Sequence, residues 1–230
     1  MIADKLLRVQ GRIASACAAA HRPVQSVTLL AVTKTFGVDA VREAFASGQR
    51  AFAENYVQEG LDKIAALADL RAGLEWHLIG PLQANKTRAV AEHFDWVHSV
   101  ERLKIAERLS AQRPATLPPL SVCIQVNISG EATKSGVAAA ELPALAQAVA
   151  ALPRLRLRGL MAIPEVAGDF EAQQRPHRAL HALFEALRRS GLPLDTLSAG
   201  MSGDLEAAIA AGATMVRVGT AIFGGRTVAG

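Results

Sequence analysis

Hydrophobic positions along the chain follow two different spacings. In residues 2–20 apolar side chains recur every three or four positions, which predicts an amphipathic helix. Residues 27–34, VTLLAVTK, form instead a continuous apolar run, which is typical of a strand buried on both faces. This predicted strand ends at Lys34, so a charged amine closes an apolar segment.

The alternation of strand and helix then repeats to the end of the chain. The predicted strands are residues 27–34, 51–55, 75–79, 96–100, 120–127, 157–163, 196–199 and 215–223. The predicted intervening helices are residues 38–47, 57–70, 85–93, 102–112, 138–151, 170–190 and 203–211. Eight strands alternating with helices predict an α/β fold, a (β/α)8 barrel of the TIM type in one domain, residues 1–230. An open parallel sheet is the alternative, and it would place a site at a switch point.

The last repeat is incomplete, because few residues follow the eighth predicted strand. We therefore expect the N-terminal helix, residues 1–21, to pack on the barrel, residues 27–224, where the last helix is missing. In a closed barrel successive side chains point alternately inward and toward the helices. Lys34 shares its parity with Val32, so the amine is expected on the inner side. Arg217 is expected to point into the barrel, where a guanidinium needs a partner or ligand.

Composition narrows the classes of function. Half of the residues are hydrophobic and 20% are charged, which suits a large core. The net charge is +4, but the basic residues are dispersed and aromatic residues are few, so we expect no nucleic-acid partner. Charges at Asp4, Lys5 and Arg8 interrupt the N-terminal segment, and no segment is long and apolar enough to span a bilayer. We expect a cytoplasmic protein without a membrane partner, in which Cys17 and Cys123 are small buried residues.

Lys34 is the first candidate for chemistry. An unpaired ammonium is costly to bury, and a lysine held neutral in an apolar setting is a nucleophile towards aldehydes. The alternative is that Lys34 simply leaves the strand for solvent.

A second candidate is the pair of loops after the seventh and eighth predicted strands. Residues 198–204 read SAGMSGD, and Gly219 and Thr220 occur in the last predicted strand. Small residues let backbone N–H groups approach an anion, and these loops form the usual phosphate site of such barrels. The alternative is an ordinary helix cap with Asp204 at the helix start.

The remaining polar residues are interpreted as structural. His177 and His181 are four residues apart without a carboxylate in an HExxH pattern, which indicates a solvated helix face rather than a metal site. We expect no metal. The other structural interpretations are a core role for His77, structural roles for His93 and His98, a solvated Glu54, and exposed lysines at Lys86 and Lys134, which at most contact phosphate.

An amine, an arginine and a phosphate-binding loop at one end of a barrel fit a phosphorylated aldehyde, above all pyridoxal 5′-phosphate (PLP). A cofactor-free aldolase that uses a lysine Schiff base is the alternative for the same amine.

The sequence also resembles a known family. The motifs LLAVTKT, FAENYVQE, WHLIGPLQANKTR, TKSG, LRGLMAIP and LSAGMSGDLEAAIAAGATMVRVGTAIFG are similar to those of the pyridoxal phosphate homeostasis proteins. The resemblance implies a barrel related to the N-terminal domain of alanine racemase, with PLP held as an internal aldimine (Schiff base) on Lys34. It also implies phosphate contacts from Ser198, Ser202, Gly219 and Thr220, an Arg217 that faces the pyridine nitrogen, and Asn55, Met161 and Met201 around the ring. Ala53, Ala199 and Gly203 depart from the usual family residues near this site.

The same resemblance implies cofactor storage or delivery, with PLP-dependent apo-enzymes as recipients and a monomeric chain. A protonated arginine cannot give its proton to the pyridine nitrogen, so the ring would be a weaker electron sink. The alternative is a racemase-like enzyme, which needs a second acid or base, whereas the only tyrosine is Tyr56 after the second strand.

Overall fold

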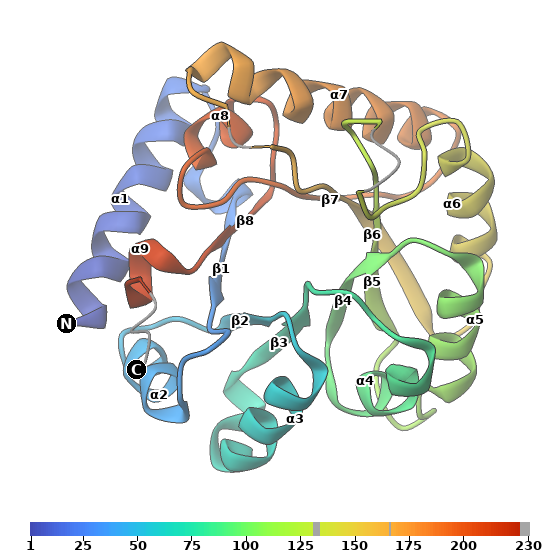
Figure 1. Cartoon of the computed structure of the whole chain (residues 1–230), viewed down its shortest axis with the longest axis horizontal. Helices are drawn as coiled ribbons and strands as arrows, with labels where there is room; N and C mark the ends of the chain where they lie inside the picture. Colours follow the sequence, from blue (N-terminus) through green and yellow to red (C-terminus); the bar gives the residue numbers. More distant parts are fainter. Residues whose placement is uncertain (131–133, 166, 226–230) are drawn as a thin grey trace.

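The computed structural model describes residues 1–130, 134–165 and 167–225. Within them eight parallel strands close into a barrel in sequence order, and helices surround it (Figure 1). The strands are β1 Thr28–Val32, β2 Ala51–Glu54, β3 Glu75–Leu78, β4 Trp96–Val100, β5 Leu120–Gln125, β6 Leu155–Met161, β7 Thr196–Ser198 and β8 Met215–Val218. The α-helices are α1 Ile2–Ala19, α2 Val38–Ala46, α3 Val57–Ala66, α4 Thr87–His93, α5 Leu103–Gln112, α6 Leu142–Ala150, α7 Phe170–Arg189, α8 Leu205–Ala210 and α9 Thr220–Phe223. The predicted barrel is confirmed.

Side chains alternate between two layers as the parity argument predicts. Leu30, Val32 and Met215 belong to the cluster inside the barrel. Val216 and Val218 belong to the larger cluster between the strands and the helices. The bulky β-branched residues of β8 thus pack against the helices, and the alternate positions of the strands remain for the barrel interior.

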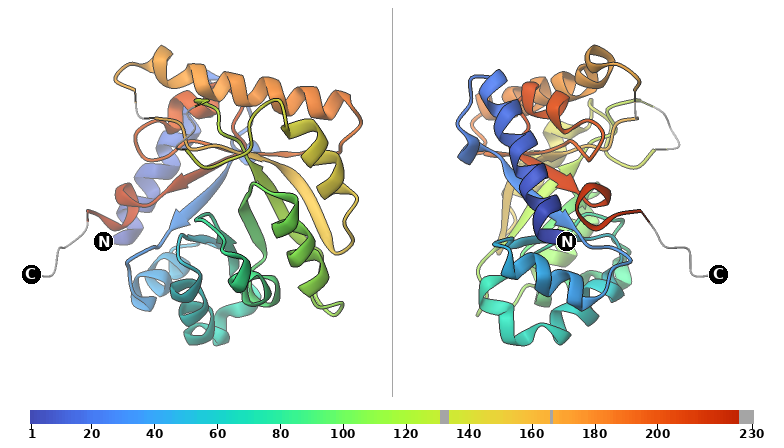
Figure 2. Two further views of the ribbon diagram at one scale, coloured as in Figure 1. Left: turned by 45° about the vertical axis from the view of Figure 1, so that its right-hand side comes forward. Right: turned by 90° about the vertical axis from the view of Figure 1, so that its left-hand side faces the viewer.

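Helix α1 covers the barrel beside β1 and β8, where a full last helix is missing. It packs against α2, α8 and α9, and Figure 1 shows it along the outer edge of the barrel. Leu6, Val9 and Ile13 are buried on its inner face. Arg12 also pairs with Glu206 of α8 at 2.7 Å. The side views of Figure 2 show α1 and α7 across different sides of the barrel, with α8 packed beside both.

Several predicted boundaries were wrong, among them the following three. Strand β8 ends at Val218, and residues 220–223 form a one-turn helix whose Ile222 N–H bonds the Gly219 carbonyl at 2.9 Å. Strand β1 ends at Val32, two residues before Lys34. Helix α6 begins only at Leu142, because a proline in its first turn suits a helix start and the preceding Val137 pairs with Val126 at the end of β5.

No helix among the described residues combines the length and apolar character needed to cross a membrane.

Candidate functional site

A cavity of about 360 Å³ opens where the carboxyl ends of β1, β2 and β8 meet. Its lining residues are Val32, Lys34, Thr35, Phe36, Asn55, Ile79, Ile163, Met201, Ser202, Gly203, Arg217, Gly219, Thr220 and Gly224. The cavity therefore contains seven of the nine residues predicted for the site, and the two outside its lining are Met161 and Ser198. The carboxyl end of the strands is where barrels of this type carry their sites.

Lys34 lies in a turn at the wall of this cavity. It is half-buried, and in the part of the chain that the structure describes no hydrogen bond or ion pair engages its amine. The expectation of a fully buried strand end was wrong, because the strand stops at Val32. The amine is nevertheless directed to the cavity and is available to a ligand.

The backbone on both sides of Lys34 is held by charged side chains of α3. Lys63 Nζ donates to the Thr33 carbonyl at 2.7 Å, and Glu59 Oε1 accepts from the Thr35 N–H at 2.6 Å. Thr35 has a φ of 68°, a left-handed conformation that a β-branched residue rarely adopts. The ion pair between Lys63 and Glu59, also 2.7 Å, thus fixes an unfavourable turn that presents Lys34 to the cavity.

Glu54 completes this cluster, and its predicted exposure to solvent was wrong. Its side chain is fully buried, pairs with Lys63 at 2.7 Å and accepts from the Thr33 hydroxyl at 2.5 Å. Burial raises the pKa of Glu54 above its ordinary value, while Lys63 opposes this shift. The sequence contained a sign of this burial. Glu54 and Phe52 are two residues apart on one strand, so both point toward the helices, where a buried carboxylate needs a partner. Glu59 and Lys63 are also four residues apart on one helix.

Arg217 points into the barrel, as predicted, and is 4% exposed. Its Nη1 donates to Ser198 Oγ at 2.8 Å, and its Nη2 donates to the Ala162 carbonyl at 2.9 Å. Among the described residues no acceptor engages its Nε–H or the second N–H of either Nη, which leaves donors for a ligand in the cavity. Burial lowers the pKa of Arg217 to about 10, so the guanidinium still carries its proton at neutral pH.

The two predicted residues outside the lining lie deeper in the barrel. Ser198 is fully buried, and its hydroxyl is engaged by Arg217 and by His98 Nδ1 at 2.8 Å. Met161 is fully buried in the interior apolar cluster. Ser198 thus reaches the cavity lining through Arg217, and Met161 belongs to the same apolar cluster as the lining residues Val32 and Ile79.

The loop after β7 supplies small residues and free backbone donors. The N–H groups of Ser202 and Gly203 have no acceptor within the described part of the chain, and both residues line the cavity. Asp204 shapes this loop, because its Oδ1 accepts from the Met201 N–H at 2.6 Å. Together with Gly219 and Thr220, which follow the neighbouring strand β8, these groups can surround an anion.

His177 lies behind this loop, and its predicted exposure on a solvated helix face was wrong. It is 3% exposed, and its Nε2 lies 2.9 Å from Asp204 Oδ2. Burial acts to raise the pKa of Asp204, but the hydrogen bonds from His177 and the Met201 N–H outweigh it, so the pKa is lowered. His181 is half-buried one turn further along α7. A lone sequence gives no sign of this pairing, because the two partners lie 27 positions apart.

Asn55, the residue that follows β2, also lines the cavity. Its Oδ1 is buried without a hydrogen-bond partner among the described residues, which suits a group awaiting a ligand. Gly80 lies directly against the backbone of Asn55. Any side chain at position 80 would displace it, because a Cβ there would lie 2.0 Å from the Asn55 carbonyl oxygen.

The other candidates lie outside this cavity. The predicted exposure of Lys86 and Lys134 was wrong, since both are half-buried. Lys134 lines a neighbouring cavity and pairs with Glu165 at 2.8 Å. His93 is exposed, whereas His77 is fully buried and hydrogen-bonded, as expected for a core histidine. Both cysteines are buried and free, as predicted. In the described residues no three His, Cys, Asp or Glu side chains gather as a metal ion would require.

The comparisons with known proteins first establish the class of barrel. The sequence profile described as alanine racemase, N-terminal domain, matches residues 10–227. Alanine racemase from Corynebacterium glutamicum superposes with a TM-score of 0.67 at 20% identity, over 96% of this chain and 62% of that chain, a likeness of fold alone. The fold and the cavity thus define an alanine-racemase-type barrel with an amine at its mouth.

Closer relatives specify the family. The chain is 62% identical to the pyridoxal phosphate homeostasis protein of Pseudomonas aeruginosa, over 98% of this chain and 96% of the relative. It is 57% identical to the protein of that name from Escherichia coli, over 98% of this chain and 97% of the relative. The structure of PipY from Synechococcus elongatus, with PLP bound, matches with a TM-score of 0.85 at 38% identity, over 97% of this chain and all of PipY. The chain belongs to the pyridoxal phosphate homeostasis protein family.

Proposed function

We propose that this chain binds PLP in the cavity at the carboxyl end of the barrel and serves to store or deliver the cofactor. The observation that carries the proposal is that an unpartnered amine, Lys34, and a buried donor-only guanidinium, Arg217, face one cavity of about 360 Å³. Pockets of this volume suit small cofactors. The bound PLP of the relative PipY supports the same ligand for this chain.

Each lining group has a role toward that ligand. The Lys34 amine attacks the aldehyde carbon and water leaves, which gives a reversible Schiff base. The Nε–H of Arg217 donates to the pyridine nitrogen, and the Asn55 amide lies beside the ring. The backbone of Ser202 and Gly203, with Gly219 and Thr220, takes the phosphate. Met201 lines the ring, and Met161 supports it from below.

Ser198 takes a different role from the one that the family resemblance implies. Its hydroxyl is already engaged by Arg217 and His98, so we assign it to holding Arg217 and not to contacting the phosphate.

The cavity favours binding over racemisation. Among its described lining residues, Lys34 and Arg217 are the two with charged side chains, and Arg217 keeps its proton at neutral pH. Tyr56 is 57% exposed and lies outside the lining. A racemase needs a second acid or base opposite the lysine, and the described lining of this cavity contains no histidine, tyrosine or carboxylate. We therefore place the chain among cofactor carriers, acting as a cytoplasmic monomer towards apo-enzymes that require PLP.

The test is to add PLP, record the absorption band of the Schiff base, reduce it with borohydride and map the labelled peptide. We expect the label on Lys34, its loss in Lys34→Ala, and full labelling in the matched control Lys86→Ala. A label on Lys86 or Lys134 with none on Lys34 would refute the assignment. Exchange of an amino-acid α-proton in deuterated water well above the rate with free PLP would favour the racemase alternative.

A further inference from the structure

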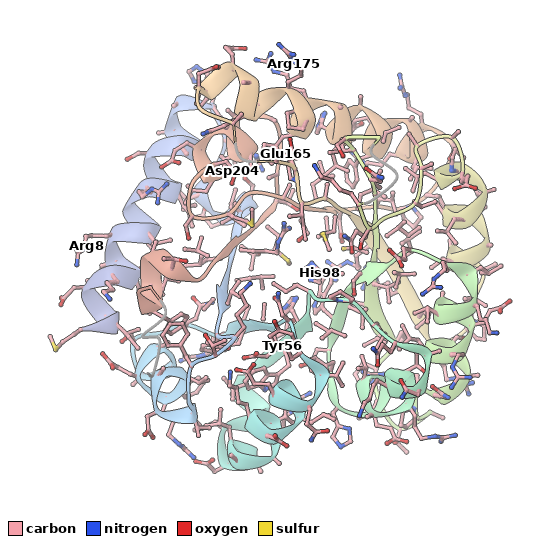
Figure 3. All side chains as sticks on the ribbon, in the orientation of Figure 1. Arg8, Tyr56, His98, Glu165, Arg175 and Asp204 are labelled. Atoms are coloured by element: carbon pink, nitrogen blue, oxygen red, sulfur yellow. The ribbon has the colours of Figure 1, made fainter. Side chains whose placement is uncertain are left out.

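A chain of polar side chains crosses the inside of the barrel beneath the cavity. Most of the interior is apolar, with residues such as Leu30, Ala53, Cys123 and Met215. Between β3 and β4 on one side of the barrel and β7 and β8 on the other, however, five polar residues follow one another. They are Glu75, His77, His98, Ser198 and Arg217. Figure 3 labels His98 near the centre of the barrel.

Every step of this chain is a short hydrogen bond. Glu75 Oε1 lies 2.8 Å from His77 Nε2, and His77 Nδ1 lies 2.9 Å from His98 Nε2. His98 Nδ1 lies 2.8 Å from Ser198 Oγ, which accepts from Arg217 Nη1 at 2.8 Å. The Glu75 side chain is 48% exposed, whereas the other four residues are buried. The chain therefore connects solvent at the amino ends of the strands with the guanidinium at the cavity floor.

The carboxylate at one end sets the direction of the hydrogen bonds. An ionised carboxylate can only accept, so His77 must carry its proton on Nε2 and, when neutral, must accept at Nδ1. His98 then donates from Nε2 and accepts at Nδ1, which leaves the Ser198 O–H as the donor to His98.

The arginine end requires the same direction. A guanidinium can only donate, so Ser198 Oγ accepts from Arg217. Ser198 is fully buried, and among the described residues no other acceptor contacts its hydroxyl. If the direction were reversed, the buried O–H of Ser198 would have no acceptor, which is costly. Both ends thus select one arrangement with two neutral imidazoles.

The surroundings favour neutral imidazoles. Burial lowers the pKa of His77, although the hydrogen bond that His77 donates to Glu75 acts to raise it. Burial also lowers the pKa of His98 well below its ordinary value, and His77 and Arg217 add to this shift. The hydrogen bond from His77 lowers the pKa of Glu75, which keeps it ionised. The other charged groups that act on these residues are Asp95 on His77 and Arg158 on Glu75. The Trp96 ring stacks on His77 at 5.2 Å between centroids.

We propose that Glu75, His77, His98 and Ser198 are positioning residues for Arg217, and that their one-way hydrogen-bond chain holds its Nε–H toward the cavity. The inference rests on the proposed function, because Arg217 matters only if a ligand's ring nitrogen lies above it. Hydrogen bonds to Ser198 and Ala162 fix one N–H group on each Nη of the guanidinium, and the Nε–H is among the donors that they leave available to the ring.

The first test needs no cofactor. Long-range ¹H–¹⁵N spectra of the full-length protein with labelled histidine, assigned with His77→Phe and His98→Phe, report the tautomer of each imidazole. We expect both imidazoles to be neutral Nε2–H tautomers at pH 7. Because each end of the hydrogen-bond chain selects this direction, Nδ1–H forms should appear only when both ends are removed, in the double variant Glu75→Ala/Ser198→Ala. The exposed Glu107→Ala should leave both unchanged. An Nδ1–H or charged imidazole in the wild type, or unchanged tautomers in the double variant, would overturn the proposal.

The second test uses PLP. We expect Ser198→Ala to weaken PLP binding about tenfold or more, as for loss of one hydrogen bond to a charged group, and to shift the absorption band of the bound cofactor. Met215→Leu, an interior control of similar volume, should bind as the wild type does. Wild-type affinity and spectrum in Ser198→Ala would contradict the positioning role. If the wild type has the expected tautomers but does not bind PLP, the proposed function fails while the hydrogen-bond chain stands.

Discussion

The buried ion pair behind Lys34 makes the sharpest prediction about stability. Lys63 Nζ lies 2.7 Å from Glu54 Oε1, and the two side chains are 7% and 0% exposed. Lys63→Met keeps the length and apolar stem of the side chain but leaves the Glu54 charge buried without a counterion. Removing one partner of such a pair costs about 3–5 kcal/mol. In a chain of this size that corresponds to a fall in Tm of about 6–20 °C.

The pH dependence of this loss has a definite sign. The pKa of Glu54 is already raised in the folded state, and removing Lys63 raises it further because Lys63 lowers it. A carboxyl group whose pKa is higher in the folded than in the unfolded protein favours folding when it is protonated. The folded state is therefore most stable below the unfolded pKa, and it loses this stability as the pH rises through the folded pKa. We therefore expect Lys63→Met to be more destabilising at pH 8 than at pH 5.

Urea unfolding followed by tryptophan fluorescence measures this difference, since Trp76 and Trp96 are both buried. Lys104→Met, an exposed lysine of α5, is the matched control and should change the free energy of unfolding little. Adding Glu54→Gln to Lys63→Met should recover part of the loss, because the unpaired charge is then gone. A loss below about 1 kcal/mol, or an equal loss at both pH values, would show that the pair is not buried as described.

Three further predictions concern the surroundings of the site. Gly80→Ala should reduce both stability and PLP affinity, because its Cβ would lie 2.0 Å from the Asn55 carbonyl oxygen; unchanged PLP titration would contradict this. Asp204→Asn should lose stability mainly at neutral pH, since the lowered pKa of Asp204 stabilises the fold above its unfolded pKa and this contribution disappears as pH falls; urea curves at pH 7 and pH 3 measure it. Both cysteines should react with a thiol reagent only after unfolding, because Cys17 and Cys123 are buried and burial raises the pKa of Cys123 to about 12. Rapid labelling of the native protein would argue against their burial.

Local patterns were sufficient for most of the fold. Apolar runs of strand length located all eight strands, because a strand buried on both faces needs apolar side chains at successive positions. They failed at residues 220–223, where an apolar segment forms a helical turn beside α1, since apolar character alone does not distinguish a buried strand from a buried turn. Parity within β8 correctly placed Arg217 inside the barrel.

The site was predictable only where its residues stand at strand ends. Lys34 and Arg217 could be selected because each is a charge in an apolar segment. Their supporting residues were misjudged or missed, because the partners of Glu54, His177 and His98 lie on other elements. No local pattern shows that a charged or polar residue will be buried against a partner that lies far away in the sequence.

The sequence by itself therefore determined the repeating α/β architecture, the barrel parity and the two charged side chains at the cavity. Only the tertiary structure decided the turn at Thr35, the Glu54–Lys63–Glu59 cluster and the histidine chain to Arg217. Hydrophobic periodicity depends on neighbours a few residues apart, whereas the bond between His98 and Ser198 joins positions 100 residues apart. Such contacts depend on the register and closure of the barrel, which are properties of the whole chain.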